Sequence, residues 1–193
     1  MLLGITGKSG AGKHTAGQFF EQRGWKVLDA DKVAHKLYRP YQRIWREVRD
    51  RFGEGILRAN DVIDRQKLKA IVFAPTDEGR KALSDLNAIV HPEVKRYLTD
   101  ESYYLKKRKA NAAIIASLWE ELGLFDVSDK VLLVKAGEAL AYERVKKRDG
   151  VDFDMYEAYT AQQKEPENAD FTVTNEGSFQ DFYKELNSLV SKL

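Results

Sequence analysis

Short apolar runs alternate with stretches of helical periodicity along this chain. The runs with the length of a buried strand lie at residues 2–6, 25–28, 112–116, 131–134 and 171–174. Because helical patterns separate these runs, we expect the strands to pair in parallel, with helices on both faces of the sheet. The pattern predicts an α/β fold with a sheet of about five strands, formed by residues 1–193 as a single domain.

Helices are predicted where apolar residues recur every three or four positions. Phe19 and Phe20 lie on the apolar face of a first helix, which Gly24 is expected to end. Residues 138–148 form a second clear helix. A capping-box sequence at Ser178 begins the last helix of the chain.

The stretch between the second and third strands is mostly helical. Pro92 lies in this stretch and is expected to interrupt a helix or to begin a new one. About residues 60–104 are too many for a simple crossover, so we predict an inserted helical subdomain. Residues 103–109 are rich in lysine and are expected to form a basic connector into the third strand.

Composition and charge exclude several classes of protein. Lys plus Arg number 32 and Asp plus Glu number 30, and a net charge of +2 is too small to indicate nucleic-acid binding. The absence of cysteine excludes disulfides and Cys-ligated zinc. No apolar run approaches the ~18 residues of a membrane span, and the N-terminal run is too short for a signal peptide. We therefore expect a cytoplasmic protein with no membrane partner.

The strongest chemical signal is a glycine-rich segment after the first strand. It matches G-x-x-x-x-G-K between a predicted strand and a predicted helix, which is the context of a phosphate-binding P-loop. Glycines let the backbone curl so that its N–H groups hold phosphate oxygens, while the helix N-terminus and the lysine add positive charge. We predict a P-loop NTPase-type fold and an ATP site formed by Gly7, Gly10, Ala11, Gly12, Lys13, His14 and Thr15.

One residue departs from this motif. A serine or threonine ordinarily follows the lysine, and its hydroxyl helps to hold Mg²⁺. This chain has His14 there, and Thr15 comes one residue late. Either Mg²⁺ is held through water and carboxylates, or the protein is slow or inactive. Mg²⁺ commonly keeps several waters, which favours the first interpretation.

Two carboxylates follow the second strand. Asp29 and Asp31 lie at its carboxyl end, which in open α/β sheets faces the ligand crevice. Asp31 is a candidate to accept a proton from an attacking hydroxyl. Either aspartate could instead cap the helix that follows, and the spacing alone does not separate these two roles.

Further blocks make the chain similar to the dephospho-CoA kinase family over nearly its whole length. In order, they are Asp29-Ala30-Asp31, Phe52-Gly53, Ile63-Asp64-Arg65, His91-Pro92-Glu93, Arg144 and Arg148, Ala169-Asp170-Phe171, and Asn175-Glu176-Gly177. The resemblance implies that ATP phosphorylates the ribose 3′-hydroxyl of dephospho-CoA, a small-molecule substrate, with Mg²⁺ as the metal. It also implies that the insert binds the acceptor and that about residues 138–168 form a short lid.

The resemblance implies roles for residues outside the phosphate loop. Asp31 matches the family's base, and Asp29 lies beside it. Arg65 and His91 fall in the acceptor-binding insert, and Asn175 falls near the adenine of ATP. From the residues alone, Arg65 could be in a surface ion pair, His91 could hold a turn before proline, and Asn175 could belong to a turn.

Three more residues complete the expected site. Arg144 and Arg148 are one helical turn apart, and they could close over the phosphates or simply lie at a solvated helix end. Glu120 matches an acidic family position and could hold Mg²⁺ through water. No arginine follows Arg148, so the lid offers ATP fewer cations than the family pattern does.

Three alternative functions stay open. The chain could phosphorylate another small acceptor, such as a nucleoside monophosphate. It could be a nucleotide-binding pseudokinase, which His14 and the arginine-poor lid would suit. The basic run at residues 106–109 could bind nucleic acid, although a solvated turn before the third strand is the simpler interpretation.

Overall fold

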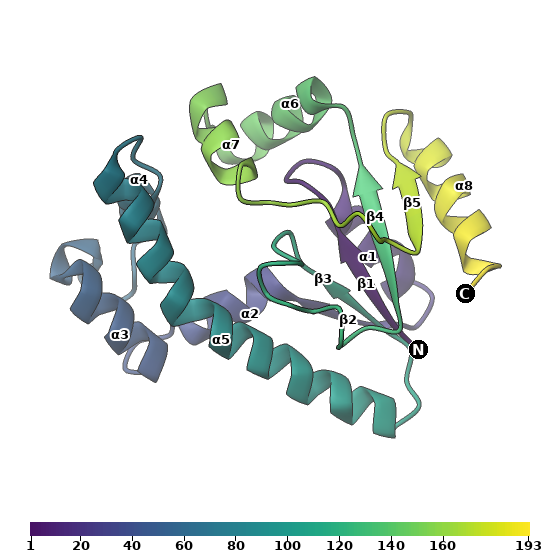
Figure 1. Ribbon diagram of the computed structural model, residues 1–193, viewed down its shortest axis with the longest axis horizontal. Coiled ribbons are helices and arrows are strands. Elements are labelled where there is room, and N and C mark those ends of the chain that lie inside the picture. The colour runs from purple at the N-terminus through teal and green to yellow at the C-terminus, as the bar shows by residue number, and fades with distance from the viewer. The chain divides into compact units, whose positions relative to one another are not determined.

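The computed structural model describes residues 1–193 and divides the chain into two compact units (Figure 1). The first unit comprises residues 1–29 and 98–193, and the second comprises residues 30–97. Helix α5, Asp77–Lys107, contributes residues to both units. None of the helices combines the length and apolar composition of a membrane span.

The first unit is built on a five-stranded sheet in the order β2-β3-β1-β4-β5. All neighbouring strands pair in parallel, which confirms the predicted sheet. The strands are β1 Leu2–Thr6, β2 Lys26–Asp29, β3 Ala112–Ile115, β4 Lys130–Lys135 and β5 Phe171–Thr174. Their carboxyl ends meet at one edge, which is where open α/β sheets bind their ligands.

Helices α1, Lys13–Glu21, and α8, Phe179–Val190, cover one face of this sheet. Ile5 of β1, Phe19 of α1 and Phe182 of α8 belong to the same buried cluster. Burying each such side chain stabilises the folded chain by about 1.5–3 kcal/mol. Packing on this face therefore holds β1 and α1 in position. Helix α1 is capped at Gln22, and Gly24 takes a positive φ of 83° two residues later.

The opposite face of the sheet is closed by other buried side chains. The indole of Trp119 lies over Gly4, where a Cβ would come within 2.3 Å of the ring. Leu98 of α5 and Leu124 are also fully buried. A glycine in the middle of β1 therefore lets a tryptophan pack directly on the sheet.

Helices α6, Glu138–Asp149, and α7, Phe153–Thr160, pack on each other within the expected lid. Gly150 ends α6 in a left-handed conformation. Helix α7 was not predicted from the sequence. The side chain of Asp152 caps it, and Tyr156 is buried in a cluster with Val145 of α6.

The second unit is helical. It contains α2 Ala30–Leu37, α3 Arg43–Phe52, the short 3₁₀ helix η1 Glu54–Ile56, α4 Arg65–Val72 and the first part of α5. Trp45 is buried, and its indole N–H donates to the carbonyl of Asp61 at 2.7 Å. The expected insert began at about residue 60, whereas this unit begins at residue 30. The acceptor-binding role of the insert and the lid role of residues 138–168 stay predictions.

Two expectations for α5 are wrong. The helix continues through Pro92, because burial of Val90 and Val94 holds the turns on both sides despite one missing N–H donor. Residues 103–107 are helical rather than a connector. Lys106 and Lys107 lie in the last turn, where positive charge is favourable to the helix dipole.

Candidate active site

The phosphate loop is tightly curled between β1 and α1. Gly7 has a φ of 139° and Gly12 a φ of 112°, and both values favour glycine. A Cβ on Gly7 would lie 2.1 Å from the carbonyl oxygen of Val134, and one on Gly12 would lie 2.2 Å from Nδ2 of Asn175. The structure therefore requires glycine at these two positions of the motif.

Lys13 is the first residue of α1 and is only 4% exposed. Its ammonium donates to the carbonyl of Lys8 at 2.9 Å, so the charge is held across the loop. Gly12 precedes it as the N-cap, and no side chain caps the helix. The backbone N–H groups in the first turn of α1 can therefore bind a phosphate.

Asn175 and Arg144 support the loop from outside. The Asn175 side chain donates to the carbonyl of Ala11 at 2.8 Å, and its backbone N–H donates to Lys135 at 2.8 Å. Arg144 donates to the carbonyl of Gly10 at 3.2 Å and to Oδ1 of Asn175 at 3.4 Å. The end of β5 and helix α6 are thereby tied to the phosphate loop.

The two arginines of α6 differ in their surroundings. Arg144 lies against the phosphate loop, whereas Arg148 pairs with its neighbour Asp149 at 2.7 Å and is largely exposed. The structure therefore brings Arg144 to the loop as a support for its carbonyl groups. That the two arginines close together over phosphates stays a prediction.

A contact with the phosphate loop that we did not predict comes from Gln163. Its Oε1 accepts from the backbone N–H of Ser9 at 2.7 Å, and its Nε2 donates to Ser9 Oγ at 3.0 Å. This side chain fastens the segment after α7 to the loop at two points. No spacing or periodicity in the sequence could have indicated a contact between residues 154 positions apart.

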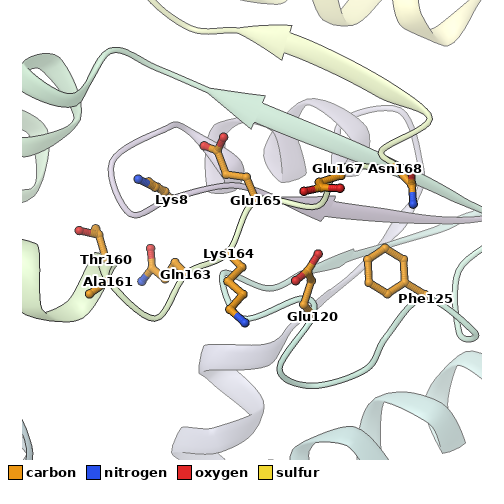
Figure 2. A pocket seen from close by; sticks show the side chains of 10 residues that line it. All are labelled: Lys8, Glu120, Phe125, Thr160, Ala161, Gln163, Lys164, Glu165, Glu167 and Asn168. Atoms are coloured by element: carbon orange, nitrogen blue, oxygen red, sulfur yellow. The ribbon is translucent and has the colours of Figure 1, made fainter. Parts of the chain in front are cut away.

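A cleft of about 790 Å³ opens beside the loop. Figure 2 shows that its lining comes from the phosphate loop, the segment after β3, the end of α7 and the segment that follows α7. The lining residues are Lys8, Glu120, Phe125, Thr160, Ala161, Gln163, Lys164, Glu165, Glu167 and Asn168. Glu120, the expected acidic residue, thus lies on the same cleft as the loop residue Lys8.

His14 pairs with Asp29 across the ends of α1 and β2. Its Nε2 lies 3.1 Å from Oδ2 of Asp29, with side chains 49% and 5% exposed, respectively. Thr15, the next residue of α1, is half-buried. Asp31 belongs to the first turn of α2 in the second unit, two residues beyond Asp29. The imidazole therefore stands where the motif would place a hydroxyl.

The second unit holds the two expected acceptor-binding residues. Arg65 begins α4, is exposed and makes no ion pair, so the ion-pair interpretation is wrong. Burial raises the pKa of Tyr38 to about 12, and the Arg65 guanidinium acts against that rise. His91 lies half-buried within α5 rather than in a turn, and burial lowers the pKa of its imidazole.

Comparisons with known proteins match the same family over nearly the whole chain. A family model described as dephospho-CoA kinase matches residues 1–181. A dephospho-CoA kinase of Fusobacterium nucleatum is 32% identical over 192 residues, covering 96% of this chain and 95% of its own. One of Aquifex aeolicus is 31% identical over 197 residues, covering 99% and 96%.

A solved structure shares the fold. It is named dephospho-CoA kinase from Campylobacter jejuni and matches with a TM-score of 0.70 at 24% identity. The match covers 99% of this chain and 96% of that one. The likeness therefore extends over the residues of both units.

Proposed function

Because the chain belongs to the dephospho-CoA kinase family, we propose that it transfers the γ-phosphate of ATP to the ribose 3′-hydroxyl of dephospho-CoA. The products are coenzyme A and ADP, and the reaction is the last step of coenzyme A biosynthesis. The observation that carries the proposal is the curled loop, with Lys13 buried at the start of α1, beside an open cleft.

The phosphate loop binds ATP. Its N–H groups and the start of α1 hold the phosphate oxygens, and Lys13 moves its ammonium from the Lys8 carbonyl to the β- and γ-phosphates. Asn175 and Arg144 keep the loop curled by binding the carbonyls of Ala11 and Gly10. A rigid loop needs no rearrangement as charge develops during transfer.

Asp31 is the proposed base. The 3′-hydroxyl oxygen forms a bond to the γ-phosphorus while the bond from that phosphorus to the ADP oxygen breaks, and ADP leaves. The hydroxyl proton passes to the Asp31 carboxylate and then to solvent. Arg65 supports binding of the acceptor, because a guanidinium with no ion pair can bind the acceptor's phosphate groups.

Mg²⁺ is the expected metal, and the donor set fits it in part. Glu120 lies on the cleft and offers an oxygen ligand, directly or through water. His14 replaces the usual hydroxyl with an imidazole, which suits Mg²⁺ poorly. When bound, the cation neutralises charge on the transferring phosphate.

The basic run at residues 106–109 gives the nucleic-acid alternative no support. Lys106 pairs with Asp129 at 3.0 Å, and Lys107 lies over the ring of Tyr103. Both lysines also lie in the last turn of α5, where their positive charge interacts favourably with the helix dipole. The cytoplasmic location stays a prediction.

The function is tested by measuring ADP release with ATP, Mg²⁺ and dephospho-CoA. Lys13→Ala should lower kcat/KM by at least about 100-fold, equivalent to about 2.7 kcal/mol, because the buried ammonium is lost. Lys107→Ala, at an exposed lysine of α5, is the control and should leave turnover unchanged.

The same assay separates the alternatives. Wild-type turnover no higher than that of Lys13→Ala, with Mg²⁺ or Mn²⁺, would establish a pseudokinase. Faster turnover with a nucleoside monophosphate than with dephospho-CoA would overturn the acceptor assignment while leaving the kinase activity in place.

A further inference from the structure

His14 occupies the position of the phosphate loop that ordinarily touches the nucleotide's metal ion. It follows Lys13 directly, in the first turn of α1, and its side chain is 49% exposed. In the ordinary motif a hydroxyl at this position helps to hold the cation beside the β- and γ-phosphates. A ligand atom on the His14 side chain is therefore accessible at the place where that cation binds.

Asp29 supplies a second ligand atom at a fixed position. The residue ends β2, where it pairs with Ile115 of β3, and its side chain is only 5% exposed. Its Oδ2 lies 3.1 Å from Nε2 of His14. The sheet therefore holds the carboxylate still, and the helix start brings the imidazole to it.

The separation of these two atoms fits a shared cation. Two adjacent ligands of an octahedral ion, each about 2.1–2.2 Å from the metal, lie about 3 Å apart. The same separation forms a hydrogen bond when no cation is bound. Cation binding requires a neutral ring whose single proton is on Nδ1, so that Nε2 offers its lone pair. A proton that bonds Nε2 to Asp29 in the absence of the ion therefore moves to Nδ1 through solvent, or leaves to solvent if the ring carries two protons.

The chemistry of this pair predicts which ion it prefers. Mg²⁺ favours oxygen ligands, whereas an imidazole nitrogen suits later divalent metals. We propose that His14 and Asp29 together bind the divalent cation of the metal–nucleotide complex and shift its preference from Mg²⁺ towards Mn²⁺ and Co²⁺. The inference rests on the proposed function, since it concerns the cation that accompanies ATP.

Pulsed electron paramagnetic resonance tests the ligand directly. Mn²⁺–ADP bound to the protein labelled with ¹⁵N-histidine should show coupling to an imidazole nitrogen. The coupling should vanish in His14→Ser, which restores the ordinary hydroxyl. It should persist in His35→Ser, the control at an exposed histidine of α2. Bound Mn²⁺–ADP without any nitrogen coupling in the wild type would overturn the proposal.

Calorimetric titration provides a second readout. The wild type should bind Mn²⁺–ADP at least about tenfold more tightly than Mg²⁺–ADP, and His14→Ser should reduce this ratio about tenfold. An unchanged ratio in the variant would show that His14 only positions Asp29. Neither measurement needs an acceptor, so failure of the metal site is distinguishable from failure of the kinase reaction.

Discussion

At the scale of single residues, the phosphate loop depends on partners far away in the sequence. Gly10 and Ala11 turn their carbonyls outward to Arg144 and Asn175, and Ser9 is bound by Gln163. Each bond satisfies a polar group that a tight turn would otherwise leave without a partner. The curl of the loop is therefore a property of several elements together.

Gln163 offers a prediction at this scale. Gln163→Ala removes both hydrogen bonds to Ser9, so the Ser9 amide and the amides of residues 161–168 should exchange with solvent faster. Hydrogen exchange followed by mass spectrometry measures the change. Gln18→Ala, at an exposed glutamine of α1, is the control, because it leaves the two bonds to Ser9 in place. Equal exchange in the wild type and Gln163→Ala would show that the contact does not hold the segment.

The sequence predicts which residues form the phosphate-binding motif better than it predicts which residues contact one another. The glycines, Lys13 and the departure at His14 follow from the motif alone. The pairing of His14 with Asp29 does not, because it depends on which strand lies beside which. The contact of Arg144 with the Gly10 carbonyl could not be predicted for the same reason, since helical spacing gives the face of α6 but not what that face contacts.

At the scale of elements, α8 shows how local signals define a helix. Ser178 Oγ accepts from the backbone N–H of Asp181 at 3.2 Å, and the Asp181 side chain accepts from the Ser178 backbone at 3.3 Å. These reciprocal bonds confirm the predicted capping box. The box fixes the start of α8, whose buried face includes Phe182 and Leu186.

Ser178→Ala should lower the free energy of unfolding by about 1 kcal/mol, because the first turn of α8 loses its cap. Urea unfolding followed by circular dichroism measures the loss. Ser188→Ala, at an exposed serine later in α8, is the control and should change stability by less than about 0.5 kcal/mol. A wild-type midpoint in Ser178→Ala would contradict the capping role.

Strands were easier to predict than connections between helices. Residues 171–174 were predicted as a strand and are β5, because Phe171 and Val173 alternate with threonines in a β-branched segment. Helix α7 has only eight residues and was missed, and α5 was expected to break at Pro92. In both cases packing against neighbours outweighed local preference.

At the scale of the whole molecule, stability should depend on the protonation of His91. Burial lowers the pKa of this imidazole below its ordinary value of about 6.5. Between the two pKa values the unfolded chain binds more protons than the folded chain, so stability rises with pH there. The contribution is fully present above about pH 6.5 and is lost as the pH falls towards the folded-state pKa.

His91→Gln should therefore flatten the stability profile between about pH 5 and pH 7. Urea unfolding at several pH values measures the slope. The prediction fails if the slopes of the wild type and His91→Gln coincide. Acid-induced losses from carboxylates with lowered pKa values, such as Asp170, belong to more acidic conditions.

The bond from Asn175 to the Ala11 carbonyl joins residues 164 positions apart. During synthesis the glycine-rich turn leaves the ribosome long before the amide that holds it in shape. A nascent or prematurely terminated chain that lacks β5 and Asn175 thus carries the complete phosphate-loop motif without the amide that holds the loop curled. Such fragments should be unable to retain ATP, so nucleotide capture marks a chain translated beyond Asn175.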